Sequence, residues 1–168
     1  MNQQVSKALQ AFIGVGSNLQ DPVNQVEQAL LALGSLPESR LLKASSLYCS
    51  QPMGPQDQPD YINAVAQIET QLPALSLLHA LQEIEYQQGR VRQRHWGERT
   101  LDLDLLLYGD QCINLPDLVV PHVGLPERNF VLYPLQEIAP LLEVPMKGSL
   151  STLISACPQA DLHLLKTA

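Results

Sequence analysis

Two aspartates, Asp102 and Asp104, stand one residue apart in the run LDLDLLLY. Leucine and aspartate alternate there, and residues two apart in a β-strand point to the same side. Both carboxylates should therefore project from one face, roughly 7 Å apart along the strand. Magnesium takes one or two carboxylates and completes its shell with substrate phosphates, and two-metal sites share such carboxylates. We therefore expect Asp102 and Asp104 to hold two magnesium ions.

An ordinary sheet with one solvated face is the other interpretation of this run. Aspartate is poorly suited to strands, and the face becomes apolar again at Leu106, so the two acids interrupt an apolar surface. These two observations favour the metal site. The same alternation predicts that four leucines enter the core together: Leu101, Leu103, Leu105 and Leu107.

Four arginines precede the acidic pair in the segment GRVRQRHWGER, in a chain with 10 Lys and Arg residues, 17 Asp and Glu residues and a formal net charge of −7. An acidic chain argues against a protein that tracks nucleic acid. A local cluster of positive charge in such a chain favours an anion site over a merely solvated face. Guanidinium groups beside bound metal are what phosphoryl transfer requires, which makes Arg90, Arg92 and Arg99 catalytic candidates.

Two further residues keep two interpretations each. Trp96, the single tryptophan, stands inside the arginine segment, where it could pack on the core or cover a bound substrate. His122, in Val-Pro-His, could be a buried hydrogen-bonded histidine or a phosphate contact. The chain has no Walker A signature and no kinase-type Gly-rich loop, so the familiar nucleotide scaffolds are excluded.

Six elements, in the order strand, helix, strand, strand, helix, strand, must position these groups. The expected strands cover residues 11–15, 40–50, 62–70 and 101–108, and the expected helices cover 22–33 and 73–88. Asp21 is a suitable N-cap for the first helix, and Pro22 suits its first position. This order predicts an α+β, ferredoxin-like βαββαβ sandwich, an antiparallel sheet with helices packed on one face.

C-terminal additions follow this unit. We expect an extended piece near residues 119–120, a helix from about residue 127 toward 138 and a short helix near 150–156, whereas the tail after Pro145 says little else. Three prolines stiffen the segment QPMGPQDQPDY between the second and third strands, which suits the wall of a binding site.

The length of 168 residues and the hydrophobic content of 45% fit one catalytic domain, residues 1–168. No apolar leader and no run of about 18 apolar residues is present, so neither targeting nor a membrane partner is expected. Cys49, Cys112 and Cys157 lack metal-binding spacing and fit reduced thiols. The expectation is a cytoplasmic monomer that acts on small molecules, with no nucleic-acid partner.

The chain resembles the 6-hydroxymethyl-7,8-dihydropterin pyrophosphokinase family of folate biosynthesis. The resemblance runs from about Ala11 to Pro145 and lies in the blocks GSN, GPQDQPDYINA, QGRVRQRHWGERTLDLDLLLYG, VPH and RNFVLYPLQEIAP. It implies a transferase of the kinase class that moves the β,γ-diphosphate of ATP to the hydroxymethyl group of the dihydropterin and releases AMP. It also implies a ferredoxin-like fold, with ATP as co-substrate and two magnesium ions on Asp102 and Asp104.

The resemblance further implies which residues contact each substrate. On the ATP side they are Gln82, Arg90, Arg92, Arg99, His122 and the backbone near Leu105. On the pterin side they are Ser50, Met53, Tyr61, Asn63, Trp96 and Phe130. Tyr61 and Phe130 would sandwich the ring while Asn63 binds its edge, and stacking combined with an amide suits a flat heteroaromatic ligand.

Three positions depart from well-known bacterial members: Gln93 replaces a lysine, Asp117 an arginine and Val123 a tyrosine. These changes bear on ATP affinity and loop closure rather than on the reaction. Two other functions compete with this one: a magnesium-dependent nucleotidyltransferase, which also pairs Gly-Ser with Asp-x-Asp, and a non-catalytic protein that binds pterin or nucleotide. Release of AMP, of pyrophosphate or of neither product separates the three.

Overall fold

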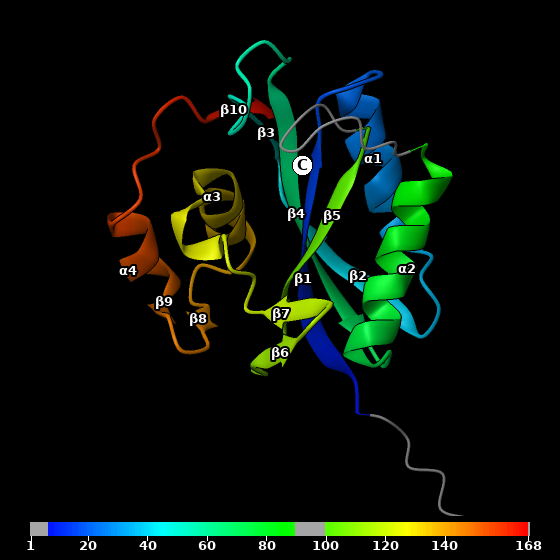
Figure 1. Cartoon of the computed structure of the whole chain (residues 1–168). Helices are drawn as coiled ribbons and strands as arrows, with labels where there is room; N and C mark the ends of the chain where they lie inside the picture. The colour runs from blue at the N-terminus through cyan, green and yellow to red at the C-terminus, as the bar shows by residue number, and fades with distance from the viewer. Residues whose placement is uncertain (1–6, 90–99, 168) are drawn as a thin grey trace, which may run out of the picture.

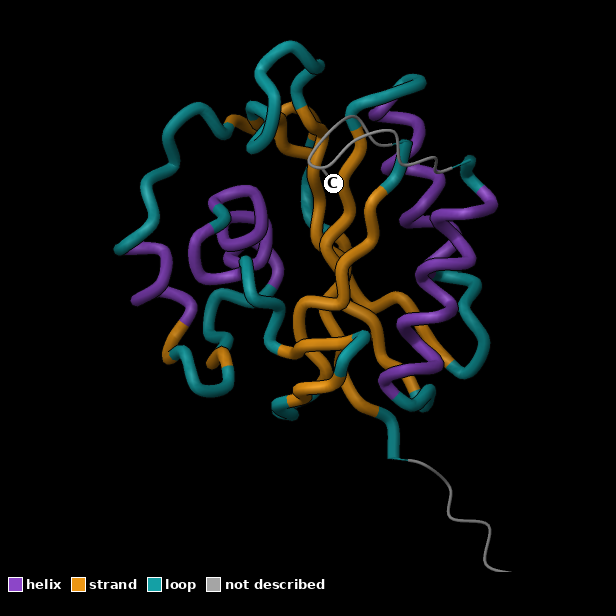
Figure 2. Tube along the Cα trace, in the orientation of Figure 1, coloured by secondary structure: helices purple, strands orange, loops and turns teal. Residues whose placement is uncertain are grey.

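The structure, a computed structural model, describes residues 7–89 and 100–167 of the chain. An antiparallel sheet forms its middle layer, with helices on both sides (Figures 1 and 2). The strands lie in the order β10-β3-β4-β1-β5, and β2 also pairs with β4. The bounds of these strands are β1 (Leu9–Ser17), β2 (Ser39–Ala44), β3 (Leu47–Ser50), β4 (Tyr61–Thr70), β5 (Asp102–Tyr108) and β10 (His163–Lys166).

Helices α1 (Pro22–Leu33) and α2 (Ala74–Gln87) cover one face of the sheet, and α3 (Asn129–Ile138) and α4 (Leu150–Ser155) lie on the other side (Figure 1). The remaining elements are the paired strands β6 (Ile113–Leu115) and β7 (Leu118–Val120), the paired strands β8 (Glu143–Val144) and β9 (Gly148–Ser149), and a 3-10 turn at Leu125–Glu127. The α+β, ferredoxin-like order of elements is confirmed, with α1 and α2 on one face and the other helices as additions. No helix in the described ranges combines the length and apolarity needed to cross a membrane.

The first core lies between the sheet and the helices α1 and α2. The start of α1 follows the predicted pattern, because the Asp21 carboxylate accepts a hydrogen bond from Asn24 N at 3.5 Å and Pro22 occupies the first helical position. Its apolar face then buries Val26 and Leu33 completely. From α2, the residues buried in this core are Leu77, Leu81 and Ile84.

The second core lies between the opposite face of the sheet and α3, and it shows that one sequence prediction is wrong. Leu101, Leu103 and Leu105 belong to the first core, but Leu107 is buried with Leu106 in the second. The register between β1 and β5 shifts at this point, with an extra residue in β5. A bulge of this kind reverses the alternation of side chains, so Leu107 faces α3 instead of following the other three leucines.

The predicted strand 40–50 is also corrected, because it is two strands. Ser45 N donates to Val65 O at 2.9 Å and Ser45 Oγ accepts from Val65 N at 2.9 Å, so this residue bonds to β4 partly through its side chain. Ser46 N instead donates to the Glu137 carboxylate on α3 at 2.8 Å. The ladder is therefore interrupted between β2 and β3, and each strand pairs with a different half of β4.

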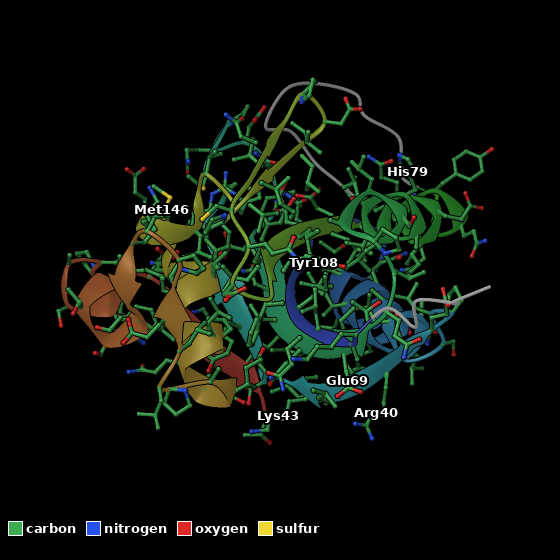
Figure 3. The ribbon with its side chains drawn as sticks, turned by 90° about the horizontal axis from the view of Figure 1, so that it is seen from below. Arg40, Lys43, Glu69, His79, Tyr108 and Met146 are labelled. Atoms are coloured by element: carbon green, nitrogen blue, oxygen red, sulfur yellow. The ribbon has the colours of Figure 1, made fainter. Side chains whose placement is uncertain are left out.

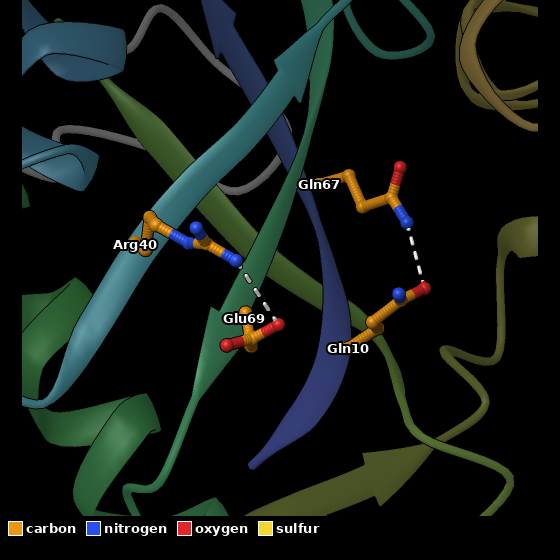
Figure 4. A network of polar contacts seen from close by, with 4 residues as sticks. All are labelled: Gln10, Arg40, Gln67 and Glu69. Carbon is orange, nitrogen blue, oxygen red and sulfur yellow. Dashed lines mark hydrogen bonds and ion pairs between the residues drawn. The ribbon is translucent and has the colours of Figure 1, made fainter.

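Polar cross-strand contacts fix the end of the sheet that lies far from Ser17. Gln67 Nε2 donates to Gln10 Oε1 at 2.8 Å, and Arg40 Nη2 lies 3.4 Å from Glu69 Oε2 (Figure 4). Arg40 and Glu69 extend toward the periphery, whereas Tyr108 lies among the side chains of the interior (Figure 3). These contacts join β2, β4 and β1 side by side at the end of the sheet opposite to the site.

Candidate active site

The ladder register places the two aspartates on the same face of the sheet. Asp102 pairs with Gly16, Gly16 with Asn63, and Asp104 with Gly14. Directly paired residues of antiparallel strands point to the same side, so both carboxylates and the Asn63 amide project from the face opposite α1 and α2. The structure thus has Asp102 and Asp104 on one face of the sheet, as the alternation of the strand predicted.

The glycines opposite the aspartates leave open space beside the carboxylates. Gly14 and Gly16 have no side chain on the face where Asp104 and Asp102 project, and all four residues line one pocket. A Cβ atom built at Gly16 would lie 3.5 Å from Asn63 Oδ1. Any larger side chain there would occupy the pocket, so the hollow follows directly from the sequence GVGS in β1.

The pocket brings together all of the described residues that the sequence analysis had assigned to pterin and metal. Among its lining residues are Ser50, Met53, Tyr61, Asn63, Phe130, Asp102 and Asp104. Its other walls come from β1, from Gln51 and Gly54 in the proline segment, and from the start of α3. Residues 51–60 form neither helix nor strand, as their prolines predicted.

Asn63 is held in one orientation at the base of this pocket. It is 4% exposed, and its Nδ2 donates to Ser50 Oγ at 2.8 Å. Since the amide nitrogen bonds to Ser50, the amide oxygen remains on the side of Gly16. This oxygen can accept a hydrogen bond from the edge of a ligand in the pocket.

The proline segment is fastened to the end of β1. Asn18, which is 1% exposed, donates through Nδ2 to Gln58 Oε1 at 3.0 Å and to Pro59 O at 2.9 Å. Gln58 is itself buried. The segment is therefore a fixed wall at this point, which supports its predicted role in binding.

Arg128 is a pocket residue that the sequence analysis did not select. Its guanidinium carbon lies 5.8 Å from the centroid of the Phe130 ring, within the range of a cation–π contact. It lines the pocket together with Asp102 and Asp104, so it brings positive charge to the acidic pair. The signal was present in the block RNF, where an arginine stands two residues before the assigned aromatic.

His122 lies beside Asp104 and is partly buried and hydrogen-bonded. Its Nε2 is 3.8 Å from Asp104 Oδ1, and its backbone N–H donates to Leu106 O at 3.0 Å. Burial lowers the pKa of His122, the charge of Arg128 lowers it further, and Asp102 opposes them. Because Nδ1 accepts from Gly124 N at 3.1 Å, the neutral ring carries its proton on Nε2, facing Asp104.

Glu85 is a second residue that the sequence analysis did not assign. It is 5% exposed, on the buried side of α2, and its Oε2 accepts from Leu103 N at 2.8 Å. β5 is an edge strand of the described sheet, so this N–H points away from β1. Glu85 therefore holds the strand at the residue between the two aspartates.

The remaining assigned residues lie elsewhere. Gln82 is exposed on α2, and the side chain of Leu105 is buried in the first core, so only its backbone faces the outer edge of β5. Asp117 and Val123 are exposed and do not line the pocket. The assigned residues outside the described ranges are Arg90, Arg92, Gln93, Trp96 and Arg99.

Comparison with known proteins identifies close relatives in sequence. The 2-amino-4-hydroxy-6-hydroxymethyldihydropteridine pyrophosphokinase of Pseudomonas aeruginosa is 51% identical over 157 residues, which cover 94% of this chain and 97% of the relative. The protein of the same name from Haemophilus influenzae is 52% identical over 156 residues, covering 93% of this chain and 96% of that one. A third, from Bacillus subtilis, is 40% identical over 133 residues, covering 79% and 80%.

A solved structure supports the fold. The Plasmodium falciparum HPPK-DHPS structure with pteroate matches with a TM-score of 0.72 at 14% identity, covering 89% of this chain and 42% of that chain. This chain thus spans less than half of that longer protein, and at this identity the likeness concerns the fold alone. The family model of 7,8-dihydro-6-hydroxymethylpterin-pyrophosphokinase (HPPK) matches residues 12–140. The protein therefore belongs to the 7,8-dihydro-6-hydroxymethylpterin-pyrophosphokinase family.

Proposed function

We propose that this protein transfers the β,γ-diphosphate of ATP to the hydroxymethyl group of 6-hydroxymethyl-7,8-dihydropterin and releases AMP. Membership of the family carries the reaction, a kinase-type transfer that belongs to folate biosynthesis. One observation carries the site: two carboxylates from β5 and an oriented amide from β4 open into the same pocket. An acidic pair meets a partly apolar pocket with two aromatic residues there, which suits a phosphate donor beside an aromatic acceptor.

The pterin ring would lie between Tyr61 and Phe130, with its edge against Asn63. Both aromatic residues line the pocket, and they come from different elements, β4 and the first turn of α3. Offset stacking on aromatic rings holds a flat heterocycle, and an amide fixes its orientation. The Ser50 hydroxyl supports this arrangement because it holds Asn63 Nδ2 at 2.8 Å.

Asp102 and Asp104 would hold two magnesium ions. Both offer carboxylate oxygens on one face of β5, and no group of three or more His, Cys, Asp or Glu side chains suited to a metal occurs among the described residues. A two-carboxylate site fits magnesium, since this ion takes its remaining ligands from phosphates and water. When bound, magnesium supplies positive charge that neutralises the phosphate oxygens during transfer.

In the proposed reaction the hydroxymethyl oxygen attacks the β-phosphorus of ATP. A bond from that oxygen to phosphorus forms, the bond from the β-phosphorus to the oxygen shared with the α-phosphate breaks, and AMP leaves while the hydroxyl proton passes to solvent. A loose transition state makes little demand for a general base, so positioning and charge carry most of the rate. Neutral His122 would donate a hydrogen bond from Nε2–H to a phosphate oxygen beside Asp104, without transfer of the proton.

The arginine segment would contribute the remaining phosphate contacts. Arg90, Arg92 and Arg99 would bind the phosphates of ATP and product, and Trp96 would cover the pterin; all four lie outside the described residues. Arg128 joins this set because it already lines the pocket next to Phe130. Gln82 and the backbone of Leu105 stay predictions for the nucleotide side, as do a monomeric state and a cytoplasmic location.

Mass-resolved product analysis tests this function. The protein is incubated with ATP, magnesium and 6-hydroxymethyl-7,8-dihydropterin, and the products are identified by mass. We expect AMP and the pterin diphosphate in equal amounts, and neither product when magnesium is chelated. Release of pyrophosphate with a nucleotidylated pterin would indicate a nucleotidyltransferase, and binding of both substrates without turnover would indicate a non-catalytic protein.

A further inference from the structure

The chain after α4 is bonded to two walls of the pocket, at Asn129 and at Gln51, although the family match ends at residue 140. It leaves α4, passes α3 and ends as strand β10 beside β3 (Figure 1). The pairs His163 with Cys49 and Leu164 with Tyr48 add it to the edge of the sheet. Leu162, just before this strand, is only 2% exposed, so the segment is anchored at this point although the residues of β10 itself are exposed.

One end of this segment is bonded to the first turn of α3. Asn129 stands between Arg128 and Phe130, both of which line the pocket. Its Nδ2 donates to Gln159 O at 2.8 Å and to Pro158 O at 3.4 Å. One helical turn later, Tyr133 OH donates to the Cys157 carbonyl at 3.0 Å. The wall that carries Phe130 is therefore fastened to residues 157–159.

The other end is bonded to the opposite wall. Asp161 Oδ2 accepts from Gln51 N at 2.6 Å, and Gln51 lines the pocket next to Ser50, which pairs with Tyr61 in the ladder. The charge on this carboxylate strengthens the hydrogen bond compared with one between neutral groups.

The connection between these two attachments is short and braced. Only Ala160 separates Gln159 from Asp161, and its φ of 50° places it in the left-handed region, which forms a tight turn. Gln159 Nε2 donates across this turn to Leu162 O at 3.0 Å. A short, braced connection can fix the distance between the two walls, whereas a long loop could not.

We propose that Asn129 and Asp161 are positioning residues that set the width of the pterin pocket, acting through the C-terminal segment 157–166. They fix the start of α3, which carries Phe130, relative to Ser50 and Gln51 beside Tyr61. Stacking of a ring between two aromatics depends on their separation. Loss of either attachment therefore weakens binding of the pterin more than binding of ATP. The inference rests on the proposed function, because it takes the pterin as the ligand of this pocket.

Direct titration of both ligands tests the proposal. The dissociation constant of 6-hydroxymethyl-7,8-dihydropterin is measured with magnesium and α,β-methylene-ATP present, since that analogue cannot release AMP; the dissociation constant of the analogue is measured separately. For Asp161→Ala we expect the pterin constant to rise about threefold to tenfold, the net effect of losing one ordinary hydrogen bond. The constant for the analogue should change less than about twofold. Asn129→Ala should behave in the same way.

Two further variants control for general loosening. Asp161→Asn keeps an acceptor oxygen for Gln51 N and should restore most of the pterin affinity. Lys166→Ala breaks the contact of Lys166 Nζ with Glu27 Oε1, 2.6 Å long, at the end of β10 away from the pocket, and should leave pterin affinity unchanged. Thermal melting of every variant confirms that it is folded.

The possible results separate the two proposals. Unchanged pterin affinity in both alanine variants, or an equal loss for pterin and for the ATP analogue, would overturn the positioning role. An equal loss in Lys166→Ala would also overturn it, because loosening of β10 would then be the cause. Failure of the wild-type protein to bind the pterin would refute the proposed function itself, and with it this inference.

Discussion

At the scale of single residues, the site depends on absent side chains as much as on present ones. Asp102 and Asp104 project from β5 on the same face as Gly16 and Gly14, their partners in β1. If either glycine carried a large side chain, the carboxylates would face it instead of a ligand. The two strands thus have complementary roles. β5 provides carboxylate oxygens that can bind metal ions, and β1 leaves space beside them for the substrate phosphates.

Replacing either aspartate by asparagine tests the role of charge at this place. Asp102→Asn and Asp104→Asn keep the shape of the side chain but remove a metal-binding carboxylate, so AMP release should fall by at least about 100-fold. Both residues are only partly buried, so the free energy of unfolding should change by less than about 1 kcal/mol. Turnover at saturating magnesium and a denaturant titration measure the two effects.

Asp110→Asn is the matched control for these variants. Asp110 is exposed and lies just beyond the end of β5, away from the pocket. Its replacement by asparagine therefore removes the same charge as the two test variants without changing a pocket residue. Its turnover should equal that of the wild type. Wild-type turnover in Asp102→Asn or Asp104→Asn would remove the metal assignment, because a ligand to an essential cation cannot be dispensable.

At the scale of elements, Glu85 links α2 to the strand that carries the acidic pair. Glu85→Ala leaves Leu103 N without its acceptor in a buried place, so β5 should move at its outer edge. We expect the magnesium concentration for half-maximal rate to rise more than the KM for the pterin. Glu85→Gln retains an acceptor oxygen and should recover part of the effect.

Glu83→Ala controls for changes in α2 itself. Glu83 lies on the exposed side of the helix, where its Oε1 accepts from Gln87 Nε2 at 3.2 Å. Magnesium dependence in Glu83→Ala should match the wild type. Equal behaviour of Glu85→Ala and Glu83→Ala would show that the contact with Leu103 has no part in positioning the aspartates.

Glu137 links α3 to Ser46, the residue at which the predicted strand 40–50 is divided into β2 and β3. Its carboxylate accepts from Ser46 N at 2.8 Å and from Tyr48 OH at 2.6 Å. Burial raises the pKa of Tyr48, and the hydrogen bond and charge of Glu137 raise it further. Glu137→Ala should lower this pKa toward 10 and reduce the free energy of unfolding by about 1–3 kcal/mol.

Spectrophotometric titration of tyrosine and denaturant unfolding measure the two consequences of Glu137→Ala. Gln136→Ala, at the neighbouring exposed position of the same helix, is the control and should leave both unchanged. A pKa of Tyr48 that did not fall would mean that the carboxylate contributes little to it. An unchanged free energy of unfolding would mean that the interruption between β2 and β3 does not depend on the contact of Ser46 with Glu137.

Local patterns predicted the elements whose cause is local. The start of α1 at Asp21 and Pro22 was confirmed, as was the strand with Asp102 and Asp104 on one face. The break at Ser46 could not be predicted, since its N–H bonds to Glu137, 91 residues away. The bulge that turns Leu107 toward α3 depends on pairing with β1, and β10 is a strand only because β3 offers an edge.

The site shows the same division between local and distant causes. Asp102, Asp104, Tyr61 and Asn63 stand in patterns or blocks that could be selected from sequence. Arg128 stands in such a block too, but its place in the pocket follows from the contact of its guanidinium with Phe130, and burial of Glu85 follows from contact with β5. Contacts between distant elements therefore account for what the sequence analysis missed.

At the scale of the whole molecule, one sheet serves two cores. In β1 the side chain of Phe12 belongs to the core under α3, and that of Ile13 belongs to the core under α1 and α2. Val65 and Ala66 divide β4 in the same way. The pocket occupies the stretch of the second face where Gly14 and Gly16 replace apolar side chains, so it lies where this second core ends.

Because the two cores share their strands, we expect them to unfold together. Leu81 in the first core and Leu132 in the second are both fully buried. Leu81→Ala and Leu132→Ala should each reduce the free energy of unfolding by about 2–5 kcal/mol, whereas Leu31→Ala, at a site 67% exposed, should change it by less than about 0.5 kcal/mol. Far-UV circular dichroism in denaturant, combined with hydrogen exchange resolved by peptide, reports on both sides of the sheet.

Loss of protection in α3 and α4 of Leu132→Ala at denaturant concentrations where α1 and α2 stay protected would show that the second core is a separate cooperative unit. The pocket would then open without unfolding of the sheet, and its walls would need the attachments at Asn129 and Asp161 all the more.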